Sequence, residues 1–182
     1  ASANHLLQYL NTTSKQTSPH RLVGRIREIY KIREHLAQLE SGTGAMLFLE
    51  GASGIGRTQL MRATSELLDT FGFDWVFCKN QNINQPMYSG FQSLFEELKT
   101  AGNQSFKEIG NDNKWSLFSN IRSALLKKTP LCIMMDNIHK ADPGTVELLE
   151  FLLFSLLEDK VPVLFILAVN TDEAPSLTEE IL

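Results

Sequence analysis

Cysteine is scarce in this sequence of 182 residues, which contains only two. Cys78 and Cys132 lie far apart and form neither a Cys-x-x-Cys pair nor a Cys/His ligand spacing. This spacing therefore disfavours a zinc ribbon and a disulfide scaffold. So few cysteines suit a reducing compartment, and we expect a cytoplasmic protein.

The sequence also lacks an excess of positive charge and any long apolar run. Its 17 Lys and Arg against 21 Asp and Glu give a net charge of −4, which disfavours a domain that coats nucleic acid or an anionic membrane. The longest apolar segments, Phe151–Leu157 and Val161–Val169, are shorter than the ~18 residues of a membrane span. Residues 1–20 lack the basic start and apolar run of a signal peptide. We expect neither a membrane span nor a nucleic-acid partner for this sequence.

What is present is the composition of one globular domain, with 43% hydrophobic and 21% charged residues. The length is close to the prior of about 150 residues per domain. Residues 1–20 are mostly polar, with a stretch rich in Asn, Thr, Ser and Gln before Pro19. We interpret residues 1–20 as a linker or loosely docked arm and residues 21–182 as the domain.

Strand-like and helix-like patterns alternate through residues 21–182. The strands are short apolar runs, as in a parallel sheet that is covered on both faces. We therefore predict an α/β fold of three layers with a mainly parallel sheet. The helix from Pro143 is apolar nearly all round, so we expect it to contact a further element besides the sheet. The predicted strands are Ala45–Glu50, Asp74–Cys78, Leu131–Met135 and Val161–Val169, and the predicted helices are Ile26–Leu39, Arg57–Asp69, two around residues 91–98 and 117–125, and Pro143–Leu157, with a surface loop over Thr100–Asn113.

A glycine-rich motif, GxxxxGRT, spans Gly51–Thr58 between a predicted strand and a predicted helix. In this context glycines let the backbone turn so that successive N–H groups cradle phosphates, and the helix N-terminus favours an anion. We expect the Thr58 hydroxyl to bind Mg²⁺. The alternative is an ordinary glycine-rich turn, which the flanking elements disfavour. The candidate nucleotide-binding residues here are Gly51, Ser53, Gly54, Ile55, Gly56, Arg57, Thr58 and Gln59.

A second motif is the apolar strand Leu131–Met135 that ends in Asp136. An aspartate at this position of a P-loop protein holds Mg²⁺ through its water shell. Because Thr58 and Asp136 would share one Mg²⁺, the strand Ala45–Glu50 should lie beside Leu131–Met135 or beside Val161–Val169. The alternative is a loop that merely begins with aspartate.

Three motifs in order resemble the AAA-type ATPase domains of the STAND class, found in large LuxR-type regulators and beside adenylyl cyclase domains. The segment Asp136–Leu149 is similar to DDxHWADPxTLELL, and Leu22–Glu28 is similar to FVGRExE, with Ile26 departing from it. The resemblance implies ATP or ADP and Mg²⁺ as cofactors. It also implies that Val23, Gly24 and Arg25 lie near the adenine and phosphates, and that a fifth strand, a helical lid and a sensor arginine follow this sequence.

Both nucleotide-binding motifs are degenerate relative to that family. Arg57 replaces the phosphate-loop lysine, and Asn137 replaces the acid that polarises the attacking water. An amide can hydrogen-bond water but cannot take its proton as a base does. Asn170 resembles the polar residue that senses the γ-phosphate, so Asn137 and Asn170 are the catalytic candidates. We interpret His139 as a packing or capping residue.

The resemblance implies an ATP-binding regulatory domain, a nucleotide-dependent switch with slow or absent hydrolysis. It implies neighbouring domains of a larger protein as partners and leaves open whether several copies of the chain assemble. One alternative is a non-hydrolysing interaction scaffold. Another is an active ATPase of the DNA-loader kind, which the acidic net charge disfavours.

Overall fold

Four parallel strands form one sheet in the order β1-β4-β3-β2 in the computed structural model, which describes residues 24–101 and 114–173. The two central strands, β3 and β4, are buried along their whole length, which explains why their sequences are continuous apolar runs. The edge strands are only partly buried. The bounds are β1 Ala45–Gly51, β2 Asp74–Lys79, β3 Leu131–Asp136 and β4 Val163–Asn170.

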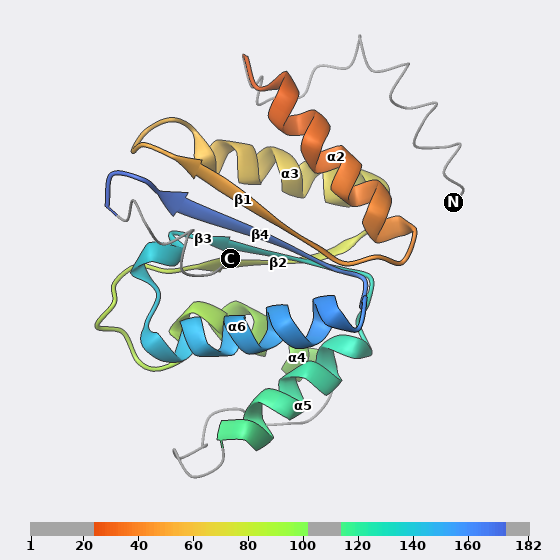
Figure 1. Ribbon diagram of the computed structural model, residues 1–182, viewed down its shortest axis with the longest axis vertical. Helices are drawn as coiled ribbons and strands as arrows, with labels where there is room; N and C mark the ends of the chain where they lie inside the picture. Colours follow the sequence, from red (N-terminus) through yellow and green to blue (C-terminus); the bar gives the residue numbers. More distant parts are fainter. Residues whose placement is uncertain (1–23, 102–113, 174–182) are drawn as a thin grey trace.

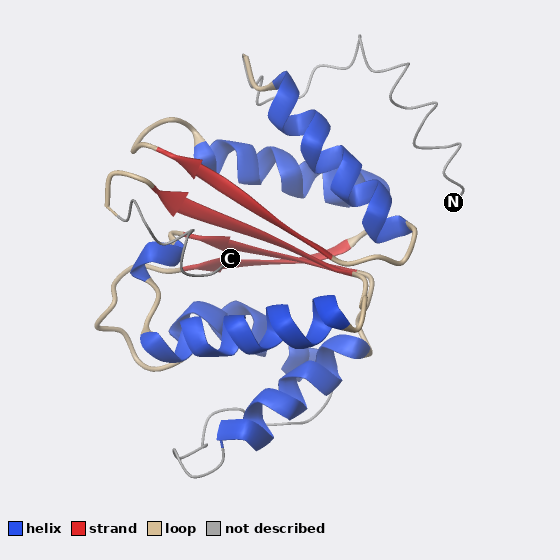
Figure 2. Cartoon of the chain, in the orientation of Figure 1, coloured by secondary structure: helices blue, strands red, loops and turns tan. Residues whose placement is uncertain are grey.

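Helices cover both faces of the sheet, so the domain has three layers (Figures 1 and 2). One face carries α2 (Ile26–Glu40) and α3 (Arg57–Phe71), and the other carries α4 (Gln92–Ala101), α5 (Lys114–Leu126) and α6 (Pro143–Glu158). Two short 3₁₀ turns, η1 (Ser89–Phe91) and η3 (Ile138–Lys140), precede α4 and α6. The predicted α/β fold with a parallel sheet is confirmed, and it is the fold of P-loop nucleotide-binding domains.

Alternate residues of a central strand pack into two separate cores. In β3, Cys132 and Met134 belong to the core under α2 and α3, whereas Ile133 and Met135 belong to the core under α4, α5 and α6. This period of two is the geometry of a strand. Helices therefore cover both faces of the central strands, so a ligand site is expected at the ends of the strands.

Local signals set the ends of the main helices. Asp142 caps α6 because its Oδ1 accepts a hydrogen bond from the Thr145 N–H at 2.9 Å, and Pro143 occupies the first turn, as predicted. Gly72 ends α3 in the left-handed conformation at φ 72°, which only glycine adopts without strain. Asp142 therefore fixes the start of α6, and Gly72 fixes the end of α3.

Two predicted boundaries are wrong. Strand β4 begins at Val163 rather than Val161, because Pro162 has no N–H to give to a neighbouring strand and the Val161 N–H bonds to Leu156 O at the end of α6. Helix α4 continues through Ala101, so the loop predicted from Thr100 does not start there. The rest of that loop and the arm predicted over residues 1–20 lie outside the described residues.

The second contact expected for α6 is supplied by α5. Phe118 and Phe151 bring their rings to 5.3 Å between these helices, and Trp115 stacks edge-on against both. Phe154 of α6 is still 72% exposed. Among the described residues, no helix combines the length and apolar character needed to cross a membrane.

Candidate nucleotide-binding site

The carboxyl edge of the sheet brings the two predicted motifs together. Strand β1 pairs with β4, so Gly51 lies opposite Asn170, and β3 lies on the far side of β4. Of the two placements predicted for β1, this is the one beside β4. The Thr58 Oγ1 donates a hydrogen bond to Asp136 Oδ2 at 3.0 Å, across 78 residues of sequence. The predicted proximity of Thr58 and Asp136 is confirmed.

The loop between β1 and α3 has the backbone of a phosphate cradle. Gly54 and Gly56 adopt φ values of 76° and 96°, a region that strains residues with a Cβ. Gly56 is the N-cap of α3, and the first N–H groups of a helix have no acceptor within the helix. Ser53 lies in the exposed loop and Gln59 in the first turn of α3. The loop therefore presents backbone donors to an anion at the sheet edge.

Arg57, which stands where the resemblance implies lysine, binds the protein itself. Its Nη1 donates to the Ala52 carbonyl at 3.1 Å and lies 3.5 Å from Asn170 Oδ1. The guanidinium therefore links the phosphate loop to the end of β4. A lysine ammonium is a compact point charge, whereas this planar group is held by acceptors on two elements.

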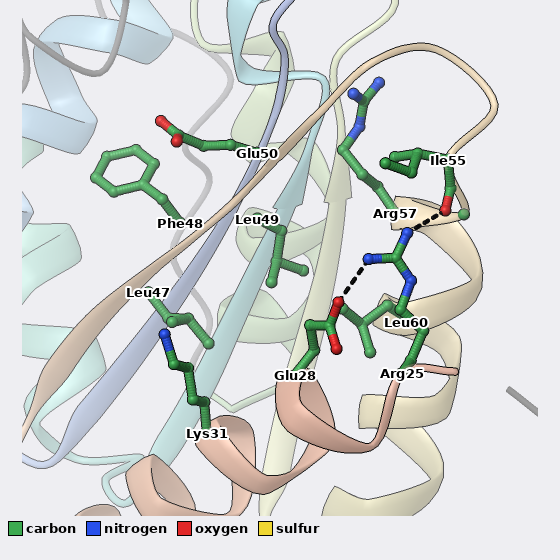
Figure 3. Close-up of a pocket in the computed structure, with 11 residues that line it drawn as sticks. Arg25, Glu28, Lys31, Leu47, Phe48, Leu49, Glu50, Ile55, Arg57 and Leu60 are labelled. Carbon is green, nitrogen blue, oxygen red and sulfur yellow. Dashed lines mark hydrogen bonds and ion pairs between the residues drawn. The ribbon is translucent and has the colours of Figure 1, made fainter. Parts of the chain in front are cut away.

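Arg25 ties the N-terminal motif to the phosphate loop. It donates to the Ile55 carbonyl and, at 2.6 Å, to Glu28 Oε1. Figure 3 shows Arg25 between these two acceptors, with the Arg57 side chain directed away from it. The hydrogen bond from Arg25 holds the pKa of the Glu28 carboxyl below its usual value. Val23 lies outside the described residues.

A cavity of about 180 Å³ lies beside this contact, between α2, β1 and the phosphate loop (Figure 3). Its walls combine apolar and charged side chains. Arg25 lies at the loop and lines the cavity, whereas the expected proximity of Gly24 to a nucleotide stays a prediction. The lining includes Arg25, Glu28, Lys31, Leu49, Ile55 and Leu60.

Asn137, the first catalytic candidate, is turned toward the end of β2. It is left-handed at φ 54°, and its Nδ2 donates to the Asn80 carbonyl at 3.3 Å. Asn80 in turn donates from both N and Nδ2 to the Asp136 carbonyl, at 3.1 and 3.0 Å. Sequence reasoning missed Asn80, whose only signal is its position directly after a strand. These bonds fix the backbone that carries the Asp136 carboxylate.

Asn170, the second catalytic candidate, sits in a network with a carboxylate that the sequence did not reveal. Its N–H donates to His139 Nδ1 at 3.3 Å, and its Nδ2 donates to Glu173 Oε1 at 2.8 Å. Lys140 Nζ pairs with Glu173 Oε2 at 3.0 Å. This lysine, together with Asn170, holds the pKa of the Glu173 carboxyl below its usual value.

His139 packs inside this network, in agreement with the packing interpretation. Its side chain is 2% exposed, and its Nε2 lies 3.5 Å from Glu173 Oε2. Burial lowers the pKa of His139, and the nearby Glu173 opposes this shift only in part. The acidic partner that sequence reasoning did not find is therefore present, in the turn that follows β4.

A parallel sheet whose strand–loop–helix motif meets a strand-end aspartate defines the P-loop class of nucleotide-binding domains. The chain matches the family model of the AAA ATPase domain over residues 21–166 and belongs to that family. Domains of this family generally bind nucleotide with Mg²⁺. No curated protein matches the chain.

Proposed function

We propose that this domain binds ATP or ADP with Mg²⁺ at the carboxyl edge of its sheet. The observation that carries the proposal is the 3.0 Å contact between Thr58 Oγ1 and Asp136 Oδ2 beneath the glycine loop. Magnesium keeps several waters and binds through one or two protein oxygens and the substrate phosphates. Thr58 and the buried Asp136 supply oxygen donors of that kind, so the residues present fit the ion.

The residues of the loop have distinct tasks in this proposal. The N–H groups from Ser53 to Thr58 and the N-terminal end of α3 bind the phosphates. Arg57 adds positive charge at the rim of the loop, where Ala52 and Asn170 hold it. The cavity beside Arg25 would take the base, against the apolar part of a lining that also carries charged side chains. When bound, Mg²⁺ neutralises phosphate charge.

We further propose that hydrolysis is slow or absent. A positioned general base contributes typically 10²–10⁴-fold in rate, and Asn137 cannot act as one. Its amide also donates to the Asn80 carbonyl. Glu173 is a poor substitute, because Lys140 and Asn170 bind its carboxylate and stabilise the ionised form. Binding without rapid turnover suits a nucleotide-dependent switch of the STAND class within a larger protein.

Two other functions would use the same fold. A scaffold that has lost nucleotide binding is disfavoured by the intact loop, since Gly54 and Gly56 keep the left-handed backbone that phosphate binding needs. An active ATPase of the DNA-loader kind requires rapid turnover and a basic surface. Turnover and DNA-binding measurements at stated salt would distinguish it.

The test is a titration with a fluorescent ATP analogue and Mg²⁺ on the wild type, Gly56→Val and Gly42→Val. Gly42 has a φ of 87° in the turn after α2, so its substitution imposes similar backbone strain away from the loop. We expect saturable binding by the wild type and Gly42→Val and none by Gly56→Val. Absence of wild-type binding, with a folded domain by circular dichroism, would leave the scaffold function in its place.

A further inference from the structure

A carboxylate of the chain itself binds the phosphate loop. The Ser53 N–H donates to Asp172 Oδ2 at 2.8 Å, across 119 residues of sequence. Ser53 supplies one of the N–H groups that we assign to the nucleotide phosphates. A carboxylate oxygen and a phosphate oxygen are both anionic acceptors, and this amide has a single proton to donate.

The turn that carries Asp172 is held in place from several sides. The Thr171 N–H donates to the Gly51 carbonyl at 3.1 Å, and the Asp172 N–H donates to Asn170 Oδ1 at 3.2 Å. Glu173 fixes the far end of the turn through Lys140, at 3.0 Å. The backbone on both sides of Asp172 is therefore held by hydrogen bonds, and this positions the Asp172 carboxylate at the loop.

Arg57 joins the same arrangement from the other side. Its Nη1 lies 3.5 Å from Asn170 Oδ1, the oxygen that also accepts from the Asp172 N–H. The charged side chain of the loop and the acidic turn after β4 thus share one amide side chain. Movement of this turn would therefore change the positions of both the Asp172 carboxylate and the Arg57 guanidinium.

We propose that Asp172 is an internal competitor for nucleotide phosphate, and that the turn Thr171–Glu173 lowers the affinity of the site while it is docked. The inference rests on the proposed function and adds a regulatory element to the same site. A phosphate group must take the Ser53 N–H from Asp172 and must also approach its negative charge. Any contact that draws this turn away from the loop would raise nucleotide affinity.

The first experiment is a competition titration with MgATP and with inorganic pyrophosphate on the wild type, Asp172→Ala and Asp172→Asn. We expect Asp172→Ala to bind both ligands about 3- to 10-fold more tightly, the size of one net hydrogen bond whose charge is screened at an exposed site. Asp172→Asn keeps an acceptor oxygen without the charge, so its gain should be smaller. Asp74→Asn makes the same charge change at the start of β2, at the opposite edge of the sheet, and should bind as the wild type does.

The second experiment follows amide hydrogen exchange of Ser53 in the ligand-free variants, which needs no nucleotide binding. We expect faster exchange in Asp172→Ala and no change in Asp74→Asn. Unchanged Ser53 exchange would overturn the inference, because the contact would then not protect the amide.

The combined outcomes separate this inference from the function on which it rests. Faster Ser53 exchange with unchanged affinity would overturn the competition and leave the proposed function intact. Absence of binding by every variant would overturn both. Binding that appears only, or more tightly, in the Asp172 variants would support both.

Discussion

The carboxyl edge of the sheet has two halves, one formed by the phosphate loop with the Asp136 carboxylate and one formed by Asn80 and Asn137, the residues that directly follow β2 and β3. In the first half, backbone donors and the Thr58–Asp136 pair face the edge where we propose that a nucleotide binds. In the second half, Asn137 and Asn80 bond to backbone carbonyls of the protein. The same parallel sheet thus keeps the geometry that we propose for binding on one side, whereas on the other side Asn137 stands where the resemblance implies an acid. We therefore expect binding and hydrolysis to be separable in this domain.

The largest effect should come from introducing into both halves the side chains that the family resemblance implies. The double variant Arg57→Lys/Asn137→Glu should gain about 10²–10⁴-fold in ATP turnover, the usual contribution of a general base. Glutamate at 137 cannot donate to the Asn80 carbonyl as the asparagine does, so its carboxylate is free to turn toward the edge. Phosphate release is the measurement, with Arg57→Lys alone as the control. Equal turnover in the single and double variants would show that more than these two side chains separates this domain from an active ATPase.

A second prediction concerns the magnesium residue of the first half. Chelation of Mg²⁺ should weaken ATP binding to the wild type on the order of 10-fold, because in our proposal Asp136 would hold the ion through its water shell. In Asp136→Asn the affinities with and without Mg²⁺ should be equal. Titration with ATP in the presence and absence of a chelator measures both. A full Mg²⁺ effect in the variant would place the ion elsewhere.

A third prediction concerns stability rather than binding. Substitution of Asp142 should destabilise the domain and leave nucleotide binding unchanged. Its carboxylate caps α6 and accepts from the N–H groups of Tyr88 and Ser89, at 2.8 and 3.1 Å. Asp142→Ala should lower the free energy of unfolding by about 2–4 kcal/mol, since a helix cap and buried donors lose their acceptor. Urea denaturation measures the loss. A variant of native stability but altered affinity would contradict the division between the halves.

The same carboxylate makes stability depend on pH. Burial raises the pKa of Asp142, but hydrogen bonds from Thr145, Tyr88 and Ser89 outweigh it and leave the pKa below its usual value. The folded-state pKa is therefore lower than the unfolded value of about 3.9. Its contribution is present above that value and is lost as the pH falls through the folded-state pKa. Asp142→Asn should lose less stability than the wild type as the pH falls below about 4.

The smallest effect should come from Arg57→Lys alone. A lysine ammonium can approach the phosphates without the planar group that Ala52 and Asn170 hold. We expect MgATP to bind about 3-fold more tightly, within the range of one screened charge pair. The dissociation constant at fixed ionic strength is the measurement. Weaker binding by the lysine variant would mean that the guanidinium contacts themselves support the loop.

The sequence was sufficient for the features that periodicity or a motif encodes. Apolar runs located the four strands, and Asp142 with Pro143 located the start of α6. The meeting of Thr58 and Asp136 followed because parallel strands present their carboxyl ends at one edge. Each of these inferences depends on a rule that applies locally along the chain.

Contacts between turns could not be predicted in this way. Asp172 accepts a hydrogen bond from Ser53 across 119 residues, and the glycine-rich motif that contains Ser53 does not predict an acidic partner at that distance. The partner of His139, Glu173, lies in that same turn. Such pairs depend on the positions of two irregular segments in the folded domain, and the periodicity of the sequence does not predict those positions. The start of β4 was missed for a different reason, because the apolar run hides the missing donor of Pro162.

In the function that we propose, this domain binds MgATP without hydrolysing it rapidly. The most direct measurement follows binding of MgATP and release of phosphate in the same sample of wild-type protein. We predict saturable binding with phosphate release close to that of buffer alone. Rapid turnover that saturates with MgATP would contradict the account.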